Sequence, residues 1–449
     1  MRSRISRGVA LLGASALSLG LMTTGVAIGT ASATGNDPGV NTTTHTVTIG
    51  ATVPLSGIAA PGYSEVAKAA NAVFKYINAK GGVNGWKVNF ILKDDCYNFV
   101  GLFGCNSPNG TVAQTQDLVE NQNVFATVGS LGTGTQDLVR NYLNNNGVPQ
   151  LFVNSGSKDW DHPTTWPMLF GFQPSYLVEG KILANYIKAK FKGQSIGVIG
   201  QHDDFGADGL QGLLNGGLTI PTADRLTYEA SDVAFNKAAF TTLVRKLQTD
   251  KAKVVVLDTV PPATKIILDA AKSLGYKPQF VISGVGADPQ TVKSTNEVNA
   301  ITFTFLPASK DTKNPWNAWI KKVLLADKTD FPSLTSKSVI DANMQYGTAW
   351  GVAFLQVLKQ LNGATPTRAG VVAAMVTQNG FATPALVALD YSASNHQGLN
   401  GGYIVKVVNG TDTTVAEGGQ IYTTGDGPLS TSPLVKSTAK IAPIPSWLS

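Results

Sequence analysis

The chain has 449 residues, of which 43% are hydrophobic and 14% are charged, and this composition predicts a globular protein of two or three domains with sizeable cores. Its formal net charge is +6, and no Lys/Arg-rich run or basic stripe is present. This charge pattern argues against nucleic acid as a partner.

The first 33 residues predict a secretory signal peptide. Three arginines precede an apolar stretch that ends in the small residues Ala31-Ser32-Ala33. Gly, Ser and Thr interrupt the apolar stretch, which argues against a transmembrane anchor. We therefore expect an exported protein, extracellular or periplasmic, whose mature form begins near Thr34 and carries a net charge of about +3.

The cysteines are Cys96 and Cys105. Neither lies at the expected cleavage point, so we expect no lipid anchor through an N-terminal Cys. Two cysteines in an exported chain predict a disulfide, which would close the short loop "CYNFVGLFGC".

From residue 46 onward, strand-like and helix-like segments alternate. Strands are expected at 46–55, 87–95, 124–130 and 148–157, and helices at 63–82, 112–122 and 135–147. After "FGFQPSY" the pattern restarts, with helices at 177–191, 207–217, 238–251 and 263–276 and strands with their loops at 195–206, 252–262 and 279–288. This alternation predicts two α/β domains, each with a parallel sheet that helices cover on both faces.

The last part of the chain departs from this alternation. We expect a long helix at 336–363, a hairpin-like pair of strands within 385–411, and a Pro-, Ser- and Thr-rich extended tail at 426–449.

The sequence lacks the motifs that carry common reactions. It has no H-E-x-x-H, no G-x-x-x-x-G-K-[ST] and no G-x-S-x-G, and "GSLGTG" lacks the order of a dinucleotide-binding turn. The four His residues lie far apart, and "HDD" at 202–204 resembles solvated or capping groups more than a metal site. We expect no catalytic residue, no cofactor and no metal.

Three polar loops follow predicted strands of the first domain: "PLSGIAAPG", "GSLGTGTQ" and "VNSGSKDW". Open α/β sheets bind ligands at this edge, and hydroxyls with helix N-termini suit a carboxylate or an amide. Each loop alone could simply cap a helix. Three such loops, facing the loops of a second domain, predict a binding cleft.

The segment from "TIGATVPLSGIAAPGYSEVAKAANAVFKYINAKGG" to "ILKDD" resembles the start of the type I periplasmic solute-binding proteins, in the leucine/isoleucine/valine-binding branch. The likeness continues through "VFATVGSLGTGTQ", "GVPQLFVNSGS", "GQHDDFGADGL" and "LGYKPQFVISGVGAD" and covers most of residues 46 to about 410. It implies two Rossmann-like lobes joined by three crossovers. The implied boundaries are 46–172 with 307–385 for lobe 1, and 173–306 with 386–425 for lobe 2.

The resemblance also implies the ligand site. The implied residues are Ser130, Leu131, Thr133, Ser155 and Ser157 from the first lobe, Phe205, Val260 and Val285 from the second, and Tyr346 on the long helix. Trp160 could stack on the ligand or pack at the hinge.

The sequence departs from the amino-acid-binding pattern at three of these places. Val285 stands where the family commonly has an acid for the ligand ammonium. Ala60 or Pro61, and Val260, stand where it commonly has aromatic residues. We therefore expect a small acid, amide or aromatic compound rather than plain leucine, isoleucine or valine.

The resulting hypothesis is a monomeric capture protein that delivers a small solute, an amino acid or a related carboxylate or amide, to the membrane permease of an ABC importer. A ligand-sensing module for a membrane receptor is the alternative. A secreted α/β enzyme has less support, because the sequence offers no nucleophile–base pair.

Overall fold

The structure is a computed structural model that describes residues 36–449 except 312–313, 378–379, 411 and 439. Residues Asn36–Ser449 belong to one compact unit. The predicted signal peptide, 1–33, lies outside the described residues.

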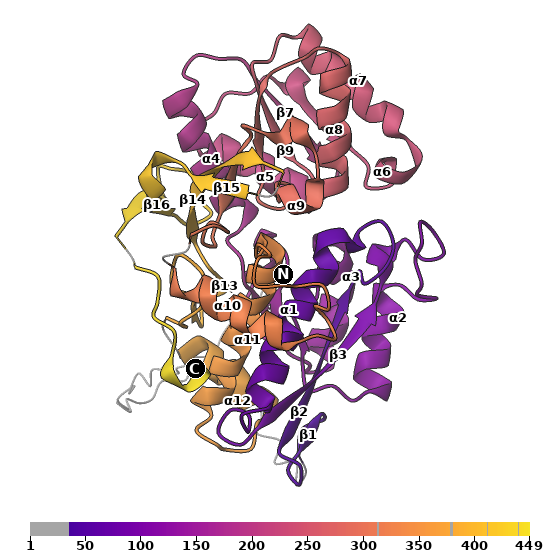
Figure 1. The fold of residues 1–449 in the computed structure, drawn as a ribbon, viewed down its shortest axis with the longest axis vertical. Helices are drawn as coiled ribbons and strands as arrows, with labels where there is room; N and C mark the ends of the chain where they lie inside the picture. Colours follow the sequence, from indigo (N-terminus) through magenta and orange to yellow (C-terminus); the bar gives the residue numbers. More distant parts are fainter. Residues whose placement is uncertain (1–35, 312–313, 378–379, 411, 439) are drawn as a thin grey trace, which may run out of the picture. The chain divides into compact units, whose positions relative to one another are not determined.

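The first lobe is built on a six-stranded sheet in which β2 to β6 run parallel and β1 is antiparallel to β2 (Figure 1). Its strands are β1 (Val40–Asn41), β2 (Thr46–Val53), β3 (Lys87–Asp94), β4 (Thr127–Val128), β5 (Gln150–Val153) and β6 (Leu169–Gly171). Its helices are α1 (Ala60–Asn78), α2 (Thr111–Gln116), α3 (Thr133–Asn145), α10 (Pro315–Ala326), α11 (Ala342–Gln360) and α12 (Arg368–Thr377).

The second lobe is built on a nine-stranded sheet. Its strands are β7 (Ile196–Gln201), β8 (Arg225–Tyr228), β9 (Val254–Asp258), β10 (Gln279–Ile282), β11 (Ile301–Thr304), β14 (Gly401–Asn409), β15 (Asp412–Val415), β16 (Ile421–Thr423) and β17 (Val435–Ser437). Its helices are α4 (Tyr176–Lys190), α5 (Asp204–Asn215), α6 (Asp232–Phe235), α7 (Lys237–Thr249), α8 (Pro261–Ser273) and α9 (Pro289–Val292). Strands β7 to β11 are parallel, and β14 adds to β11 in the antiparallel sense.

The predicted fold class is confirmed: parallel-dominated sheets form two α/β lobes. Within the described residues the chain crosses between the lobes after β6, after β11 and after β13 (Asn395–Gly398). These passages correspond to the three crossovers that the resemblance implied.

The short hairpin of β12 (Asp390–Ser392) and β13 lies against the first lobe, although the sequence analysis assigned 386–425 to the second. The Tyr391 hydroxyl donates to the Gly171 carbonyl at 2.7 Å, and His396 stacks on Phe170 with ring centroids 3.8 Å apart. Both partners belong to β6, so the hairpin follows the edge of the first sheet before the chain crosses.

The segment predicted as an extended tail packs on the body of the protein. Strand β17 pairs with β16, and the Trp316 indole N–H donates to the Ala442 carbonyl at 2.7 Å. Leu448 is fully buried in the core of the first lobe. Composition alone predicts that the few apolar residues of this C-terminal segment are exposed. In the structure, Leu448 and its neighbours pack beside α10 instead.

The core of the first lobe depends on the close approach of α1 and α11. A Cβ atom on Gly347 would lie 1.8 Å from the Val66 carbonyl oxygen, so only glycine fits at this position. The contact holds α11, and with it Tyr346, against α1.

Candidate functional site

A cavity of about 890 Å3, counting its opening to solvent, lies between the two lobes. From the first lobe it is lined by Tyr63, Val66, Tyr97, Leu131, Gly132, Thr133, Asn154, Gln173, Ala342, Asn343 and Tyr346. From the second lobe and the crossovers it is lined by Tyr176, Glu179, Phe205, Val260, Gly284, Val285, Asp288, Phe303, Thr304, Phe305 and Leu306. Six of the nine sequence-predicted ligand residues therefore line one cavity: Leu131, Thr133, Phe205, Val260, Val285 and Tyr346.

The turn before α3 places one polar group of the cavity. Gly132 adopts a φ of +111°, a conformation that favours glycine, and α3 begins at Thr133. The Thr133 hydroxyl is 2.7 Å from that of Ser155. The free N–H groups of the first helical turn and this hydroxyl can together receive an anionic or carbonyl oxygen.

Ser130 and Ser155 do not line the cavity, contrary to the sequence-based expectation. Ser130 is 2% exposed, and its hydroxyl accepts from the Thr52 N–H at 3.1 Å. The Ser155 hydroxyl contacts Thr133 and accepts from the Ser157 N–H at 3.2 Å. Each hydroxyl accepts from a backbone N–H, on β2 for Ser130 and within its own loop for Ser155, because buried N–H groups need acceptors.

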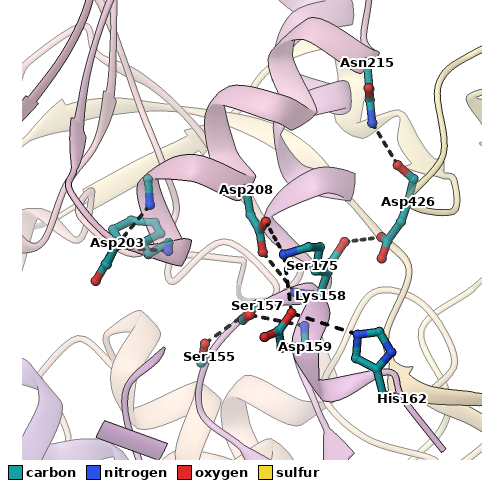
Figure 2. A network of polar contacts seen from close by, with 12 residues as sticks. Ser155, Ser157, Lys158, Asp159, His162, Ser175, Asp203, Asp208, Asn215 and Asp426 are labelled. Atoms are coloured by element: carbon teal, nitrogen blue, oxygen red, sulfur yellow. Dashed lines mark hydrogen bonds and ion pairs between the residues drawn. The ribbon is translucent and has the colours of Figure 1, made fainter. Parts of the chain in front are cut away.

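Ser157 also lies outside the cavity lining and caps a short helical turn (Figure 2). Its hydroxyl accepts from the Asp159 N–H at 3.2 Å. The next residue, Lys158, bridges the lobes: its N–H and its ammonium donate to the Asp208 carboxylate at 3.1 and 3.0 Å. Trp160 is fully buried within the first lobe, next to this contact and outside the lining residues. The part of the loop from Ser157 to Trp160 thus serves lobe contact, while Asn154 at its start lines the cavity.

The second-lobe wall begins at the N-terminus of α5. Asp203 caps this helix through the N–H groups of Phe205 and Gly206 at 3.1 and 3.3 Å, which places the Phe205 ring 4.6 Å from that of Tyr176. The "HDD" loop is thus a helix cap. Its His202 lies 2.5 Å from Glu229, and the described residues hold no group of three or more His, Cys, Asp or Glu that could bind a metal.

Glu179 is an acidic cavity residue that the sequence analysis did not single out. It lies in the first turn of α4, is 5% exposed, and accepts from the Gly284 N–H at 2.7 Å. Burial raises the pKa of its carboxyl to about 8, and the nearby Asp258 adds to the shift. Val285 stands where the family commonly has an acid. The Glu179 carboxyl, on α4, instead contacts Gly284, the residue next to Val285.

Asp288 is the second acid on the wall. It caps α9 by accepting from the Gln290 N–H at 2.8 Å and also reaches across to the Ala342 N–H at 3.3 Å. Burial raises the pKa of its carboxyl. Among the described residues that line the cavity, none is Lys, Arg or His.

Aromatic side chains form much of the remaining wall. Tyr63 lies three residues after Ala60, the position at which the family commonly has an aromatic residue. Tyr97 comes from the loop that the cysteines enclose. Gly132 leaves room for this ring, because a Cβ there would lie 2.5 Å from Tyr97. The hydroxyl of Tyr346 and the Oδ1 of Asn154 have no hydrogen-bond partner among the described residues.

The disulfide between Cys96 and Cys105 is confirmed, with an S–S distance of 2.08 Å. Cys96, Tyr97 and Asn98 all adopt positive φ, between 47° and 63°. This tight turn directs the chain so that Tyr97 faces the cavity. Apart from the two cysteines that enclose the loop, its sequence contains no pattern that predicts this turn.

Two α/β lobes with a ligand-sized cavity between them define the fold of the type I periplasmic binding proteins. Comparison with known proteins agrees with this definition: the sequence pattern of the family "periplasmic binding protein" matches residues 46–412, so the chain belongs to this family. The resemblance inferred from the sequence is confirmed.

Several known relatives and solved structures are similar to this chain. A Leu/Ile/Val-binding protein homolog 3 of Brucella melitensis is 25% identical over 279 residues, which cover 60% of this chain and 69% of the relative. A fatty acid ABC transporter substrate-binding protein from Thermomonospora curvata has the same fold, with a TM-score of 0.69, 17% identity, and coverage of 91% and 97%. A branched-chain amino acid ABC transporter protein from Thermus thermophilus, with bound valine, has a TM-score of 0.68, 18% identity, and coverage of 83% and 97%.

In the part of the chain that the structure describes, no helix has the length and apolar character needed to cross a membrane.

Proposed function

We propose that this chain is the extracytoplasmic substrate-binding protein of an ABC importer and captures a small solute between its lobes. One observation carries the proposal: a single cavity takes walls from both lobes, and the polar groups of its first-lobe wall face acids and aromatic rings of the second. A solute that touches both walls would hold the lobes together, in the hinge closure by which periplasmic binding proteins enclose their ligands.

The cavity chemistry supports a solute with a polar head and an apolar body. The N-terminus of α3 and the Thr133 hydroxyl suit a carboxylate or amide oxygen. Glu179 can accept from a nitrogen when ionised or donate to an oxygen when protonated. Relatives named for branched-chain amino acids and a neighbour named for fatty acids both fit this description.

Purification of the native protein together with its bound solute tests the proposal. The mature protein, purified without denaturation, should carry a solute that mass spectrometry identifies and that rebinds unchanged after removal. N-terminal sequencing of the exported form should begin near Thr34. Small-angle scattering should show compaction when the solute rebinds. Chemical conversion of the solute would reject the proposal in favour of an enzyme.

Thr133→Val provides the site-specific arm. Loss of a hydrogen bond to a charged group of the solute should weaken binding by roughly ten- to a hundredfold. Thr135→Val is the matched control, because the Thr135 hydroxyl is buried and donates to the Leu131 carbonyl at 2.6 Å, outside the cavity lining. Equal effects of the two substitutions would remove Thr133 from the site.

A further inference from the structure

A second, smaller cavity of about 380 Å3, counting its opening to solvent, adjoins the main one. We call it the side chamber. It is lined by Ile58, Ala59, Tyr63, Tyr97, Phe99, Gln201, Ala230, Val233, Val260 and Pro262. Residues from both lobes contribute, so the side chamber also lies between them.

The side chamber and the main cavity share three wall residues: Tyr63, Tyr97 and Val260. Most of the other wall residues of the side chamber are apolar. Its amide, on Gln201, is already paired, since it donates to Asp203 at 2.6 Å and accepts from the Tyr228 hydroxyl at 3.1 Å. The chamber is thus an apolar compartment beside the main cavity, whose wall carries the polar groups Thr133, Glu179 and Asp288.

The disulfide loop covers this compartment. Phe99 lines it, and its ring lies 6.0 Å from that of Phe103, which in turn lies 4.9 Å from Phe235 on α6 of the second lobe. Phe235 remains 64% exposed, while its neighbour Val233 is buried and lines the chamber. A loop whose role the sequence left open therefore builds a wall and an aromatic contact between the lobes.

We propose that the side chamber receives the apolar tail of the captured solute, and that the solute is an amphiphile with a tail longer than the side chain of leucine. This inference rests on the proposed function, because the polar head must sit in the main cavity. Two facts support this occupant over a polar one. The chamber adjoins the cavity that would hold the head, across Tyr63, Tyr97 and Val260, and its walls offer an incoming polar group little beyond the two tyrosines.

Binding of homologous probes tests the tail length. Straight-chain carboxylic acids, amines and 2-amino acids, each with about four, eight and twelve carbons, would be titrated into the unliganded mature protein by calorimetry. For the head that binds, affinity should rise by about fourfold for each methylene that enters an apolar wall. The rise should continue beyond the four-carbon probe.

Filling the side chamber should remove this gain. Ala230→Trp fills it from the second lobe and Ala59→Phe from the first, so a folding defect in one variant leaves the other to decide. Each should lower affinity for the eight-carbon probe by at least about tenfold and change that of the four-carbon probe less than about twofold. Ala234→Trp, on α6 but outside both cavity linings, is the matched control.

The outcomes separate the inference from the proposed function. If probes bind with the same affinity at every length, or if the filling variants weaken short and long probes equally, the tail assignment is overturned while solute capture stands. If no probe binds and no solute co-purifies with the native protein, the proposed function itself fails. A co-purified solute without an apolar chain would also overturn the inference.

Discussion

Glu179 offers a direct test of how the second lobe holds a buried acid beside the cavity. Glu179→Gln removes the charge and keeps the shape, and the new amide oxygen can still accept from the Gly284 N–H, which lies 2.7 Å from the native carboxyl. Any effect on stability should therefore report the ionisation of this one group.

The direction in which stability changes with pH follows from the raised pKa of the Glu179 carboxyl. The carboxyl has a pKa of about 8 in the folded protein, against an ordinary value of 4.5, chiefly because it is buried. As the pH rises between these values, the unfolded chain loses this proton while the folded chain keeps it, so stability present at acidic pH is lost as the pH rises through about 8. From about pH 5 to about pH 7.5, a shift of this size lowers the free energy of unfolding by about 3 kcal/mol.

Urea unfolding across this pH range measures the effect. The free energy of unfolding of Glu179→Gln minus that of the native protein should grow by about 3 kcal/mol from acid to neutral pH. Glu297, whose pKa burial also raises, is present in both proteins and cancels in this difference. Glu120→Gln, at an exposed site, should follow the native curve. A difference that stays constant with pH would refute the reasoning.

Three further predictions concern the framework of the site. Lys181→Met should expose residues 424–432 to amide hydrogen exchange, because the buried ammonium donates to the Thr424 hydroxyl and to three carbonyls of this segment at 2.6–2.8 Å; unchanged protection would contradict this role. Replacing Cys96 and Cys105 together by Ser should cost roughly 2–3 kcal/mol in denaturant unfolding, since the closed loop is short, and a loss below about 0.5 kcal/mol would contradict it. Gly347→Ala should lower the melting temperature sharply, because the new methyl group would meet the backbone of α1, and an unchanged midpoint would show that the helices can separate.

The sequence alone determined the architecture, because hydrophobic periodicity is local. The patterns of residues 252–258 and 263–276, for example, predict a buried strand and an amphipathic helix without reference to the rest of the chain. The alternation of such segments predicts parallel sheets. The sequence also predicted the disulfide, from an expected signal peptide and two cysteines, and the structure contains it. Loops at the carboxyl ends of parallel strands meet at one edge of their sheet, and the loops that hold Leu131 and Thr133 in the first lobe and Val285 in the second line one cavity.

Only the tertiary structure decided which polar groups face that cavity. A hydroxyl in a loop can bind a ligand or accept a hydrogen bond from a nearby backbone N–H group. The hydroxyls of Ser130 and Ser157 accept from backbone N–H groups, because buried donors need acceptors. Glu179 could not be found from its helix, whose sequence is apolar on several sides; the packing of α4 on α5 and β14 sets its direction. Tyr97 faces the cavity because three successive residues adopt positive φ, a choice that depends on the closed loop and on the space above Gly132.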